Sequence, residues 1–224
     1  MKPALKTLLN LSFVLASIFS LPAQAVPQDA LGLTPEQLET LKAMARARGE
    51  DPNANVSWWY GFSTQRMTAP RLMWALDMHE PDFALLLLEL GADPNSELPR
   101  VHTSALMLAS EKGYLDVVEA LIKAGADVQA ANLSGDTALS LAIQAHKIKM
   151  VEYWLKTLKA RGLSREAIEK MADGSARKPL FNYLSGEGAL DAMAQWLKAG
   201  GDINQRDLIG RTPLMAAATN GQQQ

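Results

Sequence analysis

One short pattern occurs twice in this chain with the same internal spacing. Residues 125–142 read "GADVQAANLSGDTALSLA" and residues 200–217 read "GGDINQRDLIGRTPLMAA". Leucines that follow a small helix-starting group recur at positions 72, 106, 139, 180 and 214, at spacings of 34, 33, 41 and 34 residues. Such a period is typical of stacked repeats. The sequence therefore predicts a series of similar units.

Each unit reads as a helix, a tight turn, a second helix and a protruding β-turn. Ser104 is expected to begin a first helix through its hydroxyl, and Gly113 to end it in a left-handed conformation. The stretch "LDVVEALIKAGAD" then predicts a second helix with a buried stripe, made by Val117, Val118, Leu121 and Ile122. No unit can bury its own apolar faces, so neighbouring units must stack.

These residues resemble the ankyrin repeat pattern. The last unit carries the pattern at Asp207, Gly210, Thr212, Pro213, Leu214, Ala216, Ala217 and Gly221, and the third at Asn132, Gly135, Thr137, Leu139 and Ala142. The resemblance covers roughly residues 66–221. It implies an all-α, ankyrin-like solenoid of helix-turn-helix repeats with protruding β-turns.

The repeats are expected at about 66–98, 99–131, 132–172 and 173–206, with a partial unit at 207–224. The third unit is irregular: its second helix is expected to reach about Ala160, with Gly162 as the stop and Ser164 capping an added turn. Residues 26–65 are expected to form an N-terminal capping helix and an aromatic linker. The edge around Trp196 and Leu214 is expected either to be a short cap or to be open to a partner, self-association included.

The first 25 residues have the pattern of a secretory signal peptide. Lys2 and Lys6 precede an apolar run of roughly 14 residues and the small-residue stretch "LPAQA". An uncleaved anchor is the alternative. The chain has no cysteine, and without residues 1–25 it would hold 20 basic and 24 acidic residues. This balance argues against nucleic acid as a partner. A periplasmic location is expected, with secretion as the alternative.

No catalytic, cofactor-binding or metal-binding motif emerges from the sequence. His79, His102 and His146 lie in turns or at helix ends without the close pairing that metal sites use. The carboxylates of Asp116 and Glu119 are expected on a solvated outer face. Trp74 and Trp154 match core positions of the repeat.

The aromatic stretch "VSWWYGF" at residues 56–62 leaves two interpretations open. It could fill the edge between the N-terminal cap and the first repeat. It could also form a carbohydrate-binding or hydrolytic site around Trp58, Trp59 and Tyr60, with Asp51 as a nearby acid. Aromatic side chains of this kind are enriched in interfaces.

The resemblance implies a non-enzymatic module that binds another protein through its concave face. Carried over by position, the contact residues would be Arg100, Thr103, Glu111, Lys112, Leu133, Ser134, Asp136, Gln144, Ala145, Leu208, Ile209, Arg211 and Asn220. Two roles are left open by the resemblance to bacterial members: immunity-like inhibition of a toxic envelope enzyme, or support of a periplasmic stress-defence enzyme.

Overall fold

A computed structural model describes residues 39, 40, 43, 51–59, 66–174, 180–198 and 202–221, with only the backbone given for 58, 59, 66, 67 and 195. The chain divides into two compact units, Met1–Ser96 and Glu97–Gln224, and each is described by itself. The expected signal peptide and most of the expected capping helix lie outside the described residues.

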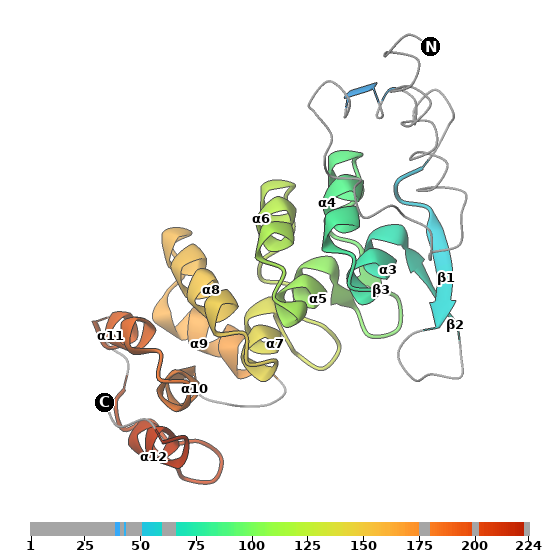
Figure 1. Cartoon of the computed structure of the whole chain (residues 1–224). Helices are drawn as coiled ribbons and strands as arrows, with labels where there is room; N and C mark the ends of the chain where they lie inside the picture. The colour runs from blue at the N-terminus through green and yellow to red at the C-terminus, as the bar shows by residue number, and fades with distance from the viewer. Residues whose placement is uncertain are drawn as a thin grey trace. The chain divides into compact units, whose positions relative to one another are not determined.

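The first unit contains a β-hairpin followed by a helical hairpin (Figure 1). Strand β1 (Asn55–Trp59) pairs antiparallel with β2 (Arg66–Pro70), and α3 (Arg71–Asp77) and α4 (Pro81–Glu89) follow. The two strands also contact α3. Residues 55–59, within the expected aromatic linker, therefore form a strand, because Arg66–Pro70 offers these residues a backbone partner.

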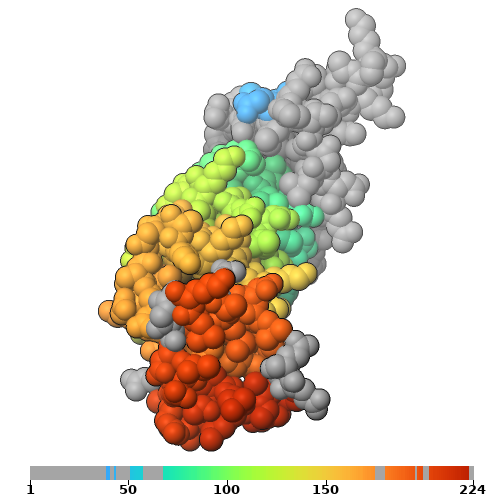
Figure 2. Space-filling view, turned by 90° about the vertical axis from the view of Figure 1, so that its left-hand side faces the viewer, coloured from blue at the N-terminus to red at the C-terminus, as the bar shows by residue number. Residues whose placement is uncertain are grey.

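The second unit begins with a short hairpin, β3 (Glu97–Leu98) and β4 (Thr103–Ser104). Its helices are α5 (Ala105–Lys112), α6 (Leu115–Lys123), α7 (Ala138–Gln144), α8 (Ile148–Ala160), α9 (Arg165–Asp173), α10 (Leu180–Gly186), α11 (Leu190–Lys198) and α12 (Pro213–Thr219). Figure 2 shows these segments following one another in chain order, from α6 to α12.

The expected helix boundaries are confirmed where the sequence carries capping residues. The side chains of Ser104, Thr137, Ser164 and Thr212 each accept a hydrogen bond from a backbone N–H in the first turn of the helix that follows. Helix α8 ends at Ala160, and Gly162 has a φ of 78°. Local sequence signals thus set where the helices begin and end.

The helices of this unit form two rows, and the first helices of neighbouring repeats pack on one another. Helix α5 packs on α7 and α10 packs on α12, while α6, α8 and α11 pack on the first helices of their own repeats (Figure 1). The repeat leucines Leu106, Leu139 and Leu180 are at most 2% exposed, and so is Leu72 in the first unit. Trp154 and Trp74 are buried, as predicted.

The edge around Trp196 and Leu214 is exposed at one of these two residues and buried at the other. Leu214 is 80% exposed, because it lies on a part of α12 that α10 does not cover and the described residues of this repeat hold no second helix. Trp196 is 5% exposed because α11 places it in one wall with Leu155, Leu163 and Ile168, so the edge is closed at this residue. The repeat position therefore predicts burial only where a neighbouring element covers it.

Helix α9 interrupts the regular row. The sequence predicted an added turn here, whereas the structure has a helix of nine residues that contacts both α7 and α10. The Thr137 hydroxyl at the start of α7 donates to the Met171 carbonyl of α9 at 2.6 Å. The extra residues in the spacing of 41 therefore form a structural element between two first helices.

Candidate functional site

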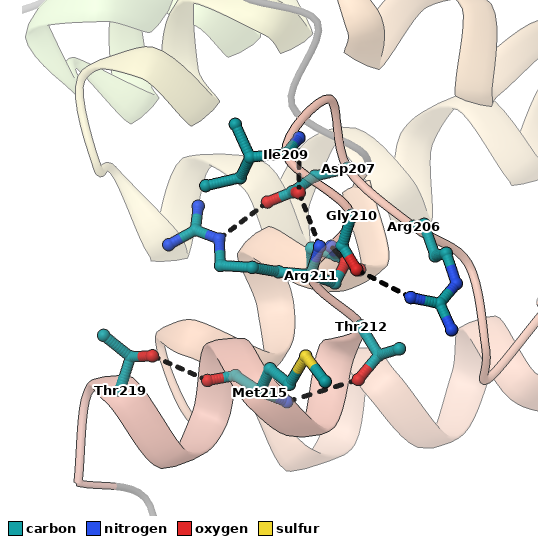
Figure 3. Close-up of polar contacts among 9 residues, drawn as sticks. Arg206, Asp207, Ile209, Gly210, Arg211, Thr212, Met215 and Thr219 are labelled. Carbon is teal, nitrogen blue, oxygen red and sulfur yellow. Dashed lines mark hydrogen bonds and ion pairs between the residues drawn. The ribbon is translucent and has the colours of Figure 1, made fainter.

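The β-turn before α12 is built around the carboxylate of Asp207 (Figure 3). Its Oδ1 accepts hydrogen bonds from the backbone N–H groups of Ile209 and Arg211 at 3.0 and 2.9 Å, and its Oδ2 accepts from Arg211 Nε at 2.8 Å. Gly210 has a φ of 79°, and its N–H donates to the Asp207 carbonyl. The side chain thus holds this turn, which we call the last finger (residues 206–212), in one conformation.

The turn before α7 has the same hydrogen-bond pattern, with asparagine in place of aspartate. Asn132 Oδ1 accepts from the backbone N–H groups of Ser134 and Asp136, both at 2.9 Å. Gly135 has a φ of 83°, and its N–H donates to the Asn132 carbonyl. We call residues 131–137 the middle finger. Two turns 75 positions apart in the sequence therefore present their tips in the same local geometry.

Both tips carry large apolar side chains in water. Leu133 is 71% exposed, Leu208 73% and Ile209 75%. The backbone N–H of Leu133 donates to the carbonyl of Val101 at 3.1 Å. Val101 lies in the turn between β3 and β4, so this hydrogen bond also fixes the middle finger against the turn of the preceding repeat. Exposed apolar side chains on a rigid backbone are suited to burial against a partner.

The other residues predicted to contact a partner lie mostly at the surface. Arg100, Ser134, Arg211 and Asn220 are exposed, and Thr103, Glu111, Lys112, Gln144 and Ala145 are half-buried. Asp116 and Glu119 are exposed on the second helix of their repeat, as expected. Exposure makes contact feasible, while the contacts themselves stay a prediction.

Asp136 is a correction to the predicted contact surface. It is 5% exposed, and its Oδ1 accepts from Gln144 Nε2 at 2.7 Å and from the Ser140 hydroxyl at 3.3 Å. Gly174, at the end of α9, approaches this carboxylate so closely that an added Cβ would lie 2.5 Å from Oδ1. The inserted helix therefore covers Asp136, and the carboxylate of Asp136 in turn holds the Gln144 amide.

A hollow lies along the faces of α10 and α12, which we call the α10–α12 hollow. It is lined by His146, Asn182, Tyr183, Gly186, Glu187, Asp207, Arg211, Ala216 and Asn220. Asn182 Nδ2 donates to the Arg211 carbonyl and Asn220 Nδ2 to the Gly186 carbonyl, both at 2.8 Å. These two amides fix the spacing of the helices that form its walls.

Ionisable groups meet at both ends of this hollow. At one end His146 Nδ1 lies 2.7 Å from Glu187 Oε1, and the rings of His146 and Tyr183 are 5.9 Å apart. Burial, the carboxylate of Glu187 and that of Glu152 raise the pKa of Tyr183. At the other end, burial alone would raise the pKa of Asp207, but hydrogen bonds from Arg211 and Ile209 and the Arg211 charge lower it overall.

The sequence did not single out Asn182, Tyr183 or Glu187. Leu180 aligns the first helix of the fourth repeat with the others, but no contact positions were carried over to this helix. One usable signal was the spacing of Tyr183 and Glu187, since residues four apart lie on one face of a helix.

The histidines occupy unusual backbone positions. His79, His102 and His146 have φ values of 61°, 53° and 54°, which places all three in the left-handed region. His102 and His146 lie in exposed turns, each 2.7 Å from a glutamate, Glu97 and Glu187 respectively. No group of three potential ligands that could hold a metal ion is present in the described part of the chain.

The aromatic stretch can be located only in part. Val56 and Ser57 lie in β1, while the side chains of Trp58 and Trp59 and all of Tyr60 are outside the described residues. Asp51 accepts a hydrogen bond from the backbone of Asn53. Within the residues described, no helix is sufficiently long and apolar to traverse a bilayer.

Comparison with known proteins assigns the repeats. Residues 72–162 match the family model for ankyrin repeats, in three copies. The ankyrin repeat and SAM domain-containing protein 6 of Danio rerio is 31% identical over 139 residues, which are 61% of this chain and 18% of that protein. The human ankyrin repeat domain-containing protein 63 is 33% identical over 96 residues, 41% of this chain and 25% of that protein. The chain thus spans a quarter or less of these relatives.

Proposed function

We propose that this ankyrin repeat protein binds another protein through its finger tips and the adjoining faces of its first helices. The observation that carries the proposal is the exposure of Leu133, Leu208 and Ile209 on two turns of the same hydrogen-bonded geometry. Ankyrin repeats serve protein–protein interaction. The proposal involves no catalysis by this chain.

The finger tips are suited to binding because little entropy is lost there. Asn132 and Asp207 already fix the backbone, so a partner orders only side chains when it covers the tips. Each tip leucine or isoleucine that becomes fully buried contributes about 1.5–3 kcal/mol from the removal of apolar surface from water. Two tips together suffice to make a measurable difference in affinity.

The deciding experiment replaces Leu133 and Leu208 together by aspartate. Because both side chains are exposed, the fold is expected to persist, with an unchanged far-UV circular dichroism spectrum. Capture of a crosslinked partner from the native cell envelope is expected to be lost. Leu115→Asp with Leu190→Asp is the matched control, since these leucines are 37% and 49% exposed on second helices. Equal capture by both variants would reject the proposed surface.

We also propose that the chain is exported to the periplasm, on the support of the signal-peptide pattern in residues 1–25. Two tests address this location directly: fractionation of cells, and N-terminal sequencing of the mature protein. A mature N-terminus at or near residue 26 in the periplasmic fraction is expected. An intact N-terminus in the cytoplasm would contradict export while leaving the proposed binding surface unaffected.

A further inference from the structure

The α10–α12 hollow differs from the finger tips in its chemistry. The tips are apolar, whereas the hollow is lined by two separate carboxylates, an arginine, a histidine, a tyrosine and two asparagines.

The charges of the hollow do not cancel. Arg211 is already engaged by Asp207 at 2.8 Å, which leaves this end close to neutral. At the other end Glu187 is paired with His146, which carries a positive charge only when it is protonated. The charges of Glu187 and Glu152 both act on Tyr183. A negative potential therefore remains at the end of the hollow formed by His146, Tyr183 and Glu187.

Two buried polar atoms of the lining are unsatisfied. Asn182 Oδ1 and Tyr183 Oη have no hydrogen-bond partner in the described part of the protein. The two residues are only 7% and 6% exposed, so bulk water is largely excluded from them. Buried polar groups are nearly always paired in folded proteins. Unpaired atoms in the wall of a hollow therefore point to a ligand that supplies hydrogen-bond donors.

We propose that the α10–α12 hollow receives a basic side chain, arginine or lysine, of the bound protein. The carboxylate of Glu187 neutralises the incoming charge. Tyr183 Oη, which has no partner in the described part of the protein, can accept a hydrogen bond from the ligand. Asn182 Oδ1 is an acceptor for the N–H groups of the ligand. This inference rests on the proposed function and specifies the partner's chemistry at one position.

Alternative occupants fit less well. A carboxylate would be repelled by Glu187, and Arg211 is already engaged by Asp207. An apolar side chain would leave Asn182 Oδ1 and Tyr183 Oη unpaired, which is costly in a water-excluded contact. Only a positively charged hydrogen-bond donor both neutralises Glu187 and supplies N–H groups to Asn182 Oδ1 and Tyr183 Oη.

The test uses the full chain and three small probes: the N-acetyl methylamides of arginine, citrulline and glutamate. Citrulline keeps the shape of arginine without its charge. Amide chemical shifts of Tyr183 and Glu187 are followed by NMR up to about 10 mM probe, since a single side chain binds weakly. The arginine probe is expected to give saturable shifts there, with little or no response to the other two. Equal responses to arginine and citrulline, or none to arginine, would overturn the proposal.

Two variants and one control variant sharpen the result. Glu187→Gln is expected to weaken arginine binding at least about fivefold, because a charged hydrogen bond is lost. Glu119→Gln makes the same change on the exposed face of α6 and is expected to have no effect. His146→Gly suits the left-handed backbone at this position and frees the Glu187 carboxylate, so arginine is expected to bind at least as tightly. Weaker binding to His146→Gly, or unchanged binding to Glu187→Gln, would contradict the assignment.

The outcome is separable from that of the proposed function. Peptides selected from a random library on the full chain are expected to be enriched in arginine or lysine and to lose binding to Glu187→Gln. Selected peptides without basic residues, still sensitive to Leu208→Asp, would overturn the basic-residue site and leave the finger surface standing. Selected peptides that lose binding to Glu187→Gln but bind Leu208→Asp normally would support the basic-residue site and overturn the finger surface.

Discussion

The indole Nε1 of Trp154 donates a hydrogen bond to the hydroxyl of Ser110 at 3.1 Å, and both residues are fully buried. Trp154 lies in α8 and Ser110 in α5, so the bond joins two successive repeats. The Ser110 hydroxyl in turn donates to the Leu106 carbonyl at 2.7 Å. The contact between repeats therefore includes a satisfied polar group within an apolar core.

Ser110→Ala is expected to lower the free energy of unfolding by about 1–3 kcal/mol, because the indole N–H of Trp154 is left buried without an acceptor. Denaturant unfolding followed by tryptophan fluorescence measures the change. Ser134→Ala, at an exposed position in the middle finger, serves as the control. A loss no larger than that of the control would show that this bond does not stabilise the stack.

Gly174→Ala is expected to destabilise the second unit more than Gly135→Ala does. An added Cβ at Gly174 meets Asp136 and Ser140 at 2.5 Å, whereas nothing lies within 4 Å of one at Gly135. Both positions have positive φ, which costs alanine roughly 1–2 kcal/mol in the left-handed region. The cost is higher at Gly174, whose φ of 46° and ψ of −153° lie near a region essentially restricted to glycine. Overpacking adds about 1–3 kcal/mol at Gly174 only. Equal effects in thermal unfolding would mean that α9 does not pack closely on α7.

Two substitutions of Asp207 test whether its carboxylate holds the last finger in one conformation. Asp207→Asn is expected to keep the turn, because Asn132 makes the same two backbone contacts in the middle finger. Asp207→Ala removes both acceptors and is expected to speed amide hydrogen exchange at Ile209 and Arg211. Protection in the alanine variant equal to that in Asp207→Asn would contradict this account of the finger.

The lowered pKa of Asp207 gives the last finger a pH dependence. Its carboxylate form is favoured in the folded state, so the stabilisation is present above the ordinary aspartate pKa of about 3.9 and is lost as pH falls below it. The protection of the Ile209 amide against exchange, relative to an unstructured amide at the same pH, is therefore expected to fall on acidification more in the parent chain than in Asp207→Asn. Identical pH profiles would contradict it.

Tyr183→Phe is expected to raise the free energy of unfolding by about 1 kcal/mol, because it removes a buried hydroxyl without a partner. The raised pKa of Tyr183 adds a second signature. Above about pH 10 an unfolded tyrosine ionises first, so stability falls as pH rises. Denaturant unfolding at neutral and alkaline pH checks both effects, and the variant is expected to lose part of the alkaline decline. A destabilised variant would indicate a hydrogen bond at Oη.

Much of the fold was predictable because local chemistry determines it. Ser104, Thr137 and Thr212 cap helices at the positions that their hydroxyls indicated, and Gly113 adopts the left-handed conformation expected of it. These features depend on a few neighbouring residues, so one sequence suffices to predict them. Leu133, Leu208 and Ile209 were named as contact residues from their place in the turn, and all three are exposed.

The misses share one cause, which is dependence on elements outside the repeat. Asp136 is buried because α9, absent from the regular pattern, ends against it. Leu214 is exposed because no second helix in the described residues covers it. The α10–α12 hollow joins residues from three repeats, and their meeting depends on how the helices stack. Pattern matching assigns positions within a unit but does not reveal what packs against them.

The central claim is that partners bind at the finger tips, and site-specific photocrosslinking tests it most directly. A benzoyl-phenylalanine placed at Ile209, and separately at Glu119 on α6, is irradiated in cells that express the full chain. The account predicts a discrete crosslinked protein from position 209 and none from position 119. Crosslinking of the same protein from position 119 alone would contradict it.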